Sequence, residues 1–189
     1  MSTPFLPKVT LEERADTTRH EATRAGVEPD YPFDVDSTVE FLFDFDLNLA
    51  ADLPPGMLGC ISFGEKTIRI SEAIDHDGRR RFTVAHEIGH LVLHRSLLEA
   101  SSTQTPLFAV EQGPAQDSSM EWQADFFAAA LLMPREAMLQ QFGEDVRRGE
   151  MIELARVASV FGVSREAARI RLEELGMILR TSPGERLHL

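Results

Sequence analysis

The chain has 189 residues, which is enough for one well-buried core with a modest C-terminal extension. Hydrophobic residues make up 43% of it and charged residues 26%, a globular balance that excludes a fibrous or largely disordered class. Its net charge of -12 opposes binding to nucleic-acid phosphates or anionic membranes unless a local basic patch exists.

The first third of the sequence predicts two helices and a strand. Residues 10–25 contain few apolar side chains and are followed by a glycine, so we expect a polar surface helix that ends there. Over residues 39–49 apolar side chains alternate as in a strand, while Ser37 and Glu40 have the spacing of a helical capping box. We therefore predict a short helix from residue 37 to about 44, followed by a strand.

The middle of the chain predicts a hairpin and a buried helix. Two apolar segments within residues 57–70 flank Gly64-Glu65, a two-residue link that favours a type II′ turn. Apolar residues then dominate over 82–93, too continuously for a surface helix, so we predict a central buried helix. Residues 100–119 are rich in Ser, Thr, Gln, Gly and Pro and predict a long surface loop.

Helical patterns return towards the end of the chain. Residues 119–133 predict a buried helix, and Pro134 marks either its end or the start of a new helix. Two further helices are predicted over 150–161 and 164–176, joined by a turn that contains Gly162. A polar tail follows them, and no internal repeat is found.

The central predicted helix carries the sequence HEIGH from His86 to His90. Two histidines four residues apart lie one above the other on a helix face, so both rings can reach one metal ion. Glu87 lies beside them, where it can contact a water on the metal and act as a base. Burying these ionisable groups in an apolar helix costs roughly several kcal/mol unless a metal supplies their partners. Gly89 is poor for a helix interior and favours close packing of another backbone there.

A catalytic zinc usually takes three protein ligands, so a third one is required. His94 lies eight residues from His86, about 12 Å along the helix axis, too far to share its ion, and we expect a packed or outer histidine. Glu121 is the better candidate because it begins a buried helix, although with Ser118 it also has capping-box spacing. Asp125, one turn later, is either an acceptor for the distal N–H of a ligating histidine or a surface acid.

The rest of the composition bears on the kind of metal site and on location. Cys60 is the only cysteine, which excludes an intrachain disulfide and a cysteine-rich zinc site. The first residues lack the pattern of a signal peptide, and no apolar run approaches the length of a membrane span. We therefore expect a cytoplasmic protein without a membrane partner.

Residues 81–94 (RFTVAHEIGHLVLH) and 121–134 (EWQADFFAAALLMP) together resemble the ImmA/IrrE family of metallopeptidases. The resemblance covers about residues 30–180 and implies a thermolysin-like zinc site whose third ligand is a Glu on a later helix, which supports Glu121. Where the family commonly has Glu followed by Ala-Asn, this chain has Gln123–Asp125, which keeps an acceptor at the last position. The resemblance also implies a substrate: a partner transcriptional repressor of the helix-turn-helix type, cut in stress responses or in mobile-element control.

The last predicted helix pair also resembles a helix-turn-helix, with Ser164 able to cap its second helix. Between residues 153 and 180, however, five arginines are set against four glutamates, which leaves a net charge near +1. Such a weak electrostatic footprint does not suit a DNA-binding surface. Direct DNA binding is therefore not expected.

We predict an α+β fold, with a thermolysin-like zinc peptidase core, a small antiparallel sheet and a helix-turn-helix-like C-terminal part. The metallopeptidase domain is expected over residues 1–142, and the C-terminal helices and tail over 143–189. His76 and Tyr31 are the two guesses for a side chain that stabilises the oxyanion.

The predicted activity is zinc-dependent cleavage of a helix-turn-helix repressor. His86, His90 and Glu121 hold the metal, zinc or in its place manganese or iron, and Glu87 is the general base. The alternative is a DNA-binding transcriptional regulator whose metal site is structural or vestigial. Glu87 discriminates between the two, because a structural site has no use for a base beside an open coordination position.

Overall fold

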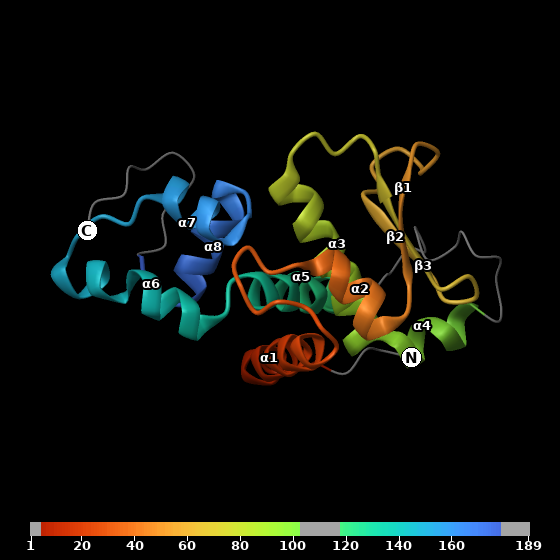
Figure 1. Cartoon of the computed structure of the whole chain (residues 1–189), viewed down its shortest axis with the longest axis horizontal. Helices are drawn as coiled ribbons and strands as arrows, with labels where there is room; N and C mark the ends of the chain where they lie inside the picture. Colours follow the sequence, from red (N-terminus) through yellow and green to blue (C-terminus); the bar gives the residue numbers. More distant parts are fainter. Residues whose placement is uncertain (1–4, 103–117, 179–189) are drawn as a thin grey trace.

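A computed structural model of the chain describes residues 5–102 and 118–178. Helices dominate these residues, and a small sheet lies at one end of the molecule, with the C-terminal helices at the other (Figure 1). In chain order the elements are α1 Lys8–Arg24, α2 Val35–Phe43, β1 Asp46–Ala50, β2 Gly59–Ser62, β3 Thr67–Ser71, α3 Asp77–Leu93, α4 Arg95–Ser102, α5 Ser118–Leu132, α6 Arg135–Arg148, α7 Leu154–Phe161 and α8 Arg165–Glu174. The predicted loop over 100–119 lies mostly outside the described residues.

The sheet has three strands in the order β1-β3-β2. β3 pairs with β2 in antiparallel fashion and with β1 in parallel fashion, so the prediction of a wholly antiparallel sheet was wrong. The reason is that Ile68 and Ile70 of β3 are both buried, and this apolar strand takes the central place between its two neighbours. β2 is left at an edge of the sheet.

The turn between β2 and β3 also differs from the prediction. Ser62 and Thr67 form the last pair, so four residues, rather than Gly64 and Glu65 alone, make the connection. A type II′ turn requires a positive φ at its first central residue, but Gly64 has none. The residue with a positive φ is Lys66, at 48°, which turns the chain back into β3.

The helix boundaries follow local capping signals, some of which the sequence pattern obscured. α2 is capped by Asp34, whose side chain accepts from the backbone N–H of Ser37, so the Ser37 capping box was wrong. α6 begins after Pro134, as one of the two interpretations of that proline had it. α7 and α8 are joined at Gly162, whose φ of 62° ends α7, and Ser164 caps α8 as predicted.

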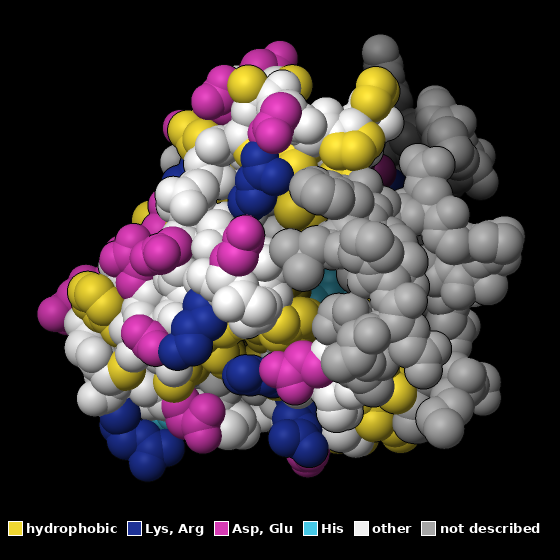
Figure 2. Space-filling view, turned by 90° about the vertical axis from the view of Figure 1, so that its right-hand side faces the viewer, with side chains coloured by type: hydrophobic (Ala, Val, Ile, Leu, Met, Phe, Trp, Pro, Cys, Tyr) yellow, Lys and Arg dark blue, Asp and Glu magenta, His cyan; other side chains and the backbone are white. Residues whose placement is uncertain are grey.

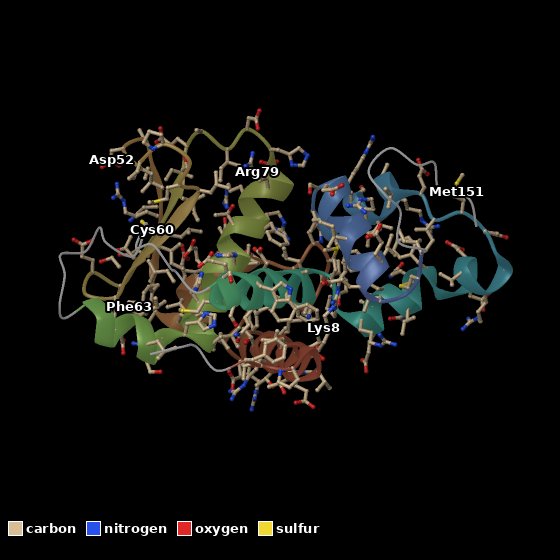
Figure 3. All side chains as sticks on the ribbon, turned by 180° about the vertical axis from the view of Figure 1, so that it is seen from behind. Lys8, Asp52, Cys60, Phe63, Arg79 and Met151 are labelled. Atoms are coloured by element: carbon tan, nitrogen blue, oxygen red, sulfur yellow. The ribbon has the colours of Figure 1, made fainter. Side chains whose placement is uncertain are left out.

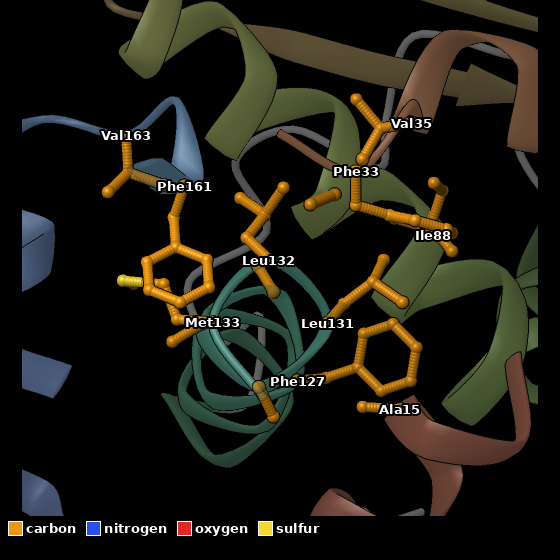
Figure 4. Packing of buried hydrophobic residues seen from close by; sticks show 14 of the residues in the cluster. Ala15, Phe33, Val35, Ile88, Phe127, Leu131, Leu132, Met133, Phe161 and Val163 are labelled. Atoms are coloured by element: carbon orange, nitrogen blue, oxygen red, sulfur yellow. The ribbon is translucent and has the colours of Figure 1, made fainter. Parts of the chain in front are cut away.

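The buried helix α5 is the centre of the hydrophobic core. Phe127, Leu131 and Leu132 are fully buried and lie among side chains from α1, α3 and the C-terminal helices (Figure 4). The expected surface helix, α1, therefore buries one face against α5, including Leu11 and Ala15. Within the described ranges, no helix combines the length and apolar character needed to cross a bilayer.

Helix α3 makes close backbone contacts near both of its ends. A Cβ added at Gly89 would lie 3.1 Å from the Cα of Ala124, so α3 and α5 approach each other closely there. At the other end, a Cβ on Gly78 would lie 2.5 Å from the backbone carbon of Val163, in the turn between α7 and α8. These two contacts fix α3 against α5 and against the C-terminal helix pair.

Candidate metal centre

Three polar side chains from α3 and α5 converge where these helices pack most closely. His86 and His90 lie one turn apart on α3, and their Nε2 atoms are 3.0 Å from each other. Glu121, in the first turn of α5, places one carboxylate oxygen 3.3 Å from His86 Nε2 and the other 3.4 Å from His90 Nε2. The close approach of Gly89 to Ala124 brings Glu121 within this reach.

The spacing of these atoms matches the geometry of a bound zinc ion. In a tetrahedral site with bonds of about 2.05 Å, neighbouring ligand atoms are about 3.3 Å apart, close to the three distances here. Two imidazole nitrogens and a carboxylate oxygen are also a ligand set that catalytic zinc sites use. Among the described residues, these three side chains form the only group with metal-ligand spacing. The residues therefore fit a metal ion.

Each histidine of the group has a second contact through its other ring nitrogen. His86 Nδ1 lies 2.8 Å from the carboxylate of Asp125, one turn after Glu121 on α5. His90 Nδ1 lies 3.1 Å from Nδ1 of His94, the residue that ends α3. Contacts of this kind fix ring orientation and tautomer, so that Nε2 is left for the metal. The helix geometry thus places His94 next to the ligand His90 but outside the group of three ligands.

The surrounding carboxylates favour positive charge at this place. Burial lowers the pKa of His86, but hydrogen bonds with Asp125 and Glu121 outweigh this effect and raise the pKa to about 10. Hydrogen bonds from His86 and His90 in turn hold the pKa of Glu121 well below its usual range. The pKa of His94 falls to about 4, because its burial and the neighbouring His90 disfavour a second cation. The site therefore attracts one cation between the ligand side chains.

The pKa of Glu87 is shifted in the opposite direction from that of Glu121. The Glu87 side chain is buried, and burial raises the pKa of its carboxyl group, although His86 and His90 partly oppose this. A carboxylate with a raised pKa takes up a proton more readily near neutral pH than an exposed one does. Glu87 is thus a buried carboxyl group in the cavity lining that can exchange a proton near neutral pH.

A cavity of about 420 Å³ opens beside these residues. Its lining includes Glu87, His86, His90 and Glu121, and also Cys60 and Phe63 of the β2–β3 hairpin. Figure 3 labels Cys60 and Phe63 at the end of the molecule that carries the sheet. Most of the remaining lining side chains are apolar, and no Lys or Arg is among the described ones. The apolar residues of the lining are Pro55, Met57, Leu58, Ile61, Phe63, Phe82 and Leu98.

Sequence reasoning missed one feature of this region, the contact between Gly59 and Glu87. Gly59 of β2 faces Glu87, and an isolated glycine inside a strand pattern is a signal that could have pointed to such a contact. The partnership of His94 with His90 was expected only in general terms. His76 occupies the N-cap position of α3, about 15 Å along the axis from His86, and neither His76 nor Tyr31 is among the described residues that line the cavity.

The chain is similar to known proteins in both sequence and fold. The sequence model of the IrrE N-terminal-like domain, Peptidase_M78, matches residues 46–173. No curated protein matches the chain significantly. Among solved structures it is similar to a Mycobacterium tuberculosis transcriptional regulator, with a TM-score of 0.59 and 19% identity. The match covers 85% of this chain but 46% of that one, so this chain spans less than half of that protein's length, and the likeness concerns the fold alone.

Proposed function

Because the chain belongs to the ImmA/IrrE family of metallopeptidases, as the IrrE N-terminal-like match over residues 46–173 shows, we propose that it is a zinc-dependent endopeptidase. Its substrate in this proposal is a partner helix-turn-helix repressor, whose cleavage relieves repression in a stress response or in mobile-element control. A repressor substrate also implies that the enzyme works in the cytoplasm.

One observation carries the proposal of a peptidase site. His86, His90 and Glu121 present three ligand atoms at tetrahedral spacing, and the buried Glu87 lies beside them in a cavity. We assign the three side chains as metal ligands, Glu87 as the general base and Asp125 as the acceptor that orients His86. A structural metal site would not need a buried base beside it.

The reaction is the addition of water to a peptide carbonyl carbon, followed by cleavage of its C–N bond. When bound, zinc supplies Lewis-acid chemistry, and manganese or iron could supply it in the cell. Glu87 accepts the proton of the attacking water and then delivers it to the leaving nitrogen as the C–N bond breaks. Its raised pKa suits both halves of this transfer.

The free edge of β2 is the proposed docking place of the substrate backbone. In an antiparallel pair, residues alternate between those bonded to the partner strand and those that face away from it. Ser71 donates to Leu58, so the pairs formed by Leu58 and Cys60 are the bonded ones. The N–H and C=O groups of Gly59 and Ile61 therefore face the open edge, where an extended peptide can add as a strand.

The finer architecture forms part of the same proposal. We propose a thermolysin-like arrangement around the metal, a metallopeptidase domain over residues 1–142 and a C-terminal part over 143–189 with a helix-turn-helix-like pair. In this proposal α7 and α8 help to build the enzyme. In the described part of the end that carries the sheet, acidic side chains lie among basic ones (Figure 2). The net charge of -12 favours encounters with a basic, DNA-binding protein.

The alternative of a DNA-binding regulator is less well supported by the C-terminal helices. Arg171 is fully buried, where it donates to the Met133 carbonyl and to both carboxylate oxygens of Glu12. Arg169 is held by Glu166 and a second glutamate on its own helix. Arginines engaged in this way cannot neutralise DNA phosphates, so this pair offers little electrostatic affinity for a duplex.

The decisive experiment is incubation of the zinc-loaded protein with the purified helix-turn-helix repressor encoded nearest to it. We expect a single cut, read by gel electrophoresis and mass spectrometry. Glu87→Gln keeps the shape and the ligands but removes the base, so it should retain zinc and lose about a hundred- to ten-thousandfold in rate. Cleavage by Glu87→Gln at the rate of the unaltered protein would refute the mechanism.

A further inference from the structure

Gly59 on the edge strand β2 lies directly against the proposed general base. A Cβ added to Gly59 would lie 2.7 Å from Glu87 Oε1, a separation that real Cβ atoms essentially never show. The same Cβ would be 3.0 Å from Thr83 Cγ2 and 3.2 Å from Ile70 Cδ1. The carboxylate of Glu87 therefore occupies the space that a side chain at residue 59 would fill.

Backbone conformation does not explain a glycine at this position. Gly59 lies inside a regular strand, paired with Ile70, and its φ is outside the left-handed range that favours glycine. The one atom that a Cβ would approach below 3.0 Å is the far end of the Glu87 side chain. An added methyl group would therefore displace the Glu87 carboxylate. The displacement needed to lengthen the 2.7 Å separation to an ordinary contact of 3.4 Å is about 0.7 Å.

Two more features define the surroundings of Gly59. Thr83 lies one turn before Glu87 on α3, and its hydroxyl donates to the backbone carbonyl of Arg79, which leaves its methyl group facing Gly59. The backbone N–H and C=O of Gly59 face the open edge of the sheet, as the pairing of β2 with β3 requires. A peptide docked along that edge therefore passes beside the carboxylate of Glu87.

We propose that Gly59 is a positioning residue for catalysis: its missing side chain holds open the space in which Glu87 reaches the reacting water, beside the β2 edge where the substrate lies. This inference rests on the proposed peptidase function. In this inference, strand β2 has two roles: its edge binds the substrate backbone, and its Gly59 sets the position of the general base Glu87.

The test is Gly59→Ala in the full-length, zinc-loaded protein. Misplacement of a reacting group by about 1 Å can cost on the order of a hundredfold in rate, so we expect kcat to fall by about ten- to a hundredfold. The KM for the repressor should change much less, because the backbone groups of the edge remain. Zinc content after dialysis should be unchanged, since the three atoms nearest to a Cβ at residue 59 belong to none of the three ligands.

Gly64→Ala is the matched control. Gly64 lies in the turn of the same hairpin, a Cβ there meets no atom within 4 Å, and its φ is ordinary. We expect this variant to keep the kcat, KM and zinc content of the unaltered protein. A loss of kcat in both variants would mean that the hairpin merely tolerates substitution poorly, and would overturn the role of Gly59.

If Gly59→Ala lowers Tm, a double variant distinguishes an effect on the position of Glu87 from a general effect on folding. When the clash with the carboxylate is the cause, Gly59→Ala in the background of Glu87→Ala should leave the Tm of that background unchanged. A loss of Tm that persists without the Glu87 carboxylate would show a purely structural role and would overturn the proposal.

A crystal structure of Gly59→Ala gives a readout that does not need activity. We expect the Glu87 carboxylate to be displaced from its place beside His86 and His90. If β2 moves instead and Glu87 stays, or if kcat is unchanged, Gly59 does not position the base. If the unaltered protein cuts no repressor, the peptidase proposal fails, and the position of Glu87 in the variant still decides the role of Gly59.

Discussion

The two ends of α3 are both packed against other segments through a glycine, yet they differ in their polar groups. At the start of the helix, Gly78 lies against the turn between α7 and α8, and Arg81 donates to the carbonyls of Gly162 and Phe33. Each of these hydrogen bonds joins a donor to an acceptor. At this end of α3, every polar group named here has a hydrogen-bond partner, as in an ordinary structural contact.

Near the other end, Gly89 lies against α5, but two histidine nitrogens there face each other without being complementary. Nε2 of His86 and Nε2 of His90 face each other, and the carboxylate of Glu121 faces both. Bringing such groups together costs free energy unless a proton or a cation joins them. Close packing alone therefore marks rigidity, whereas close packing with mismatched polar groups marks a site that binds something.

The largest effect should come from removing the third ligand. Glu121→Ala should abolish tight zinc binding and activity, because two histidines alone hold the ion weakly. His94→Ala should keep the metal, since His94 contacts His90 and lies outside the ligand group. Metal content after dialysis distinguishes them: a zinc-free His94→Ala protein beside a zinc-containing Glu121→Ala protein would show that the site is wrongly assigned.

The next effect is on folding and concerns the structural end of α3. Gly78→Ala places a methyl group 2.5 Å from the Val163 backbone, and overpacking of this kind typically costs about 1–3 kcal/mol of unfolding free energy. Chemical denaturation measures the loss, and zinc per chain should be unchanged in the folded protein. Gly143→Ala is the control, because its Cβ meets only Leu139 at 4.0 Å. Equal stability of the two variants would contradict a tight contact at Gly78.

A smaller effect is expected at the partner of His86. Asp125→Ala should weaken zinc affinity by about ten- to a hundredfold, as the loss of a group that orients a ligand typically does. The fluorescence of Trp122, the only tryptophan and the neighbour of Glu121, offers a convenient signal for the titration. Unchanged affinity would reduce Asp125 to a surface acid.

No effect at all is expected for DNA. The isolated chain should show no specific duplex binding at physiological salt, and Arg165→Ala with Arg169→Ala should change nothing in a mobility-shift assay. A footprint that disappears in the double variant would show instead that the C-terminal end of the molecule reads DNA, and would promote the regulator alternative.

The part of the site that lies within one helix could be predicted from the sequence. His86 and His90 are four residues apart, and a helix places such residues on one face whatever surrounds it. The same argument kept His94 out of the ligand group. The family to which the chain belongs was also evident from two short segments, because their order and spacing are specific.

The remaining features depend on contacts between segments that are distant in the sequence. The packing of helices and strands against one another decides three such features. They are the central place of β3 between β1 and β2, the contact of Gly59 with Glu87, and the burial of Arg171 against Glu12. Periodicity describes which face of an element is apolar, but not which neighbour covers that face. Only the tertiary structure could therefore decide how close α5 comes to α3, and with it whether Glu121 reaches the two histidines.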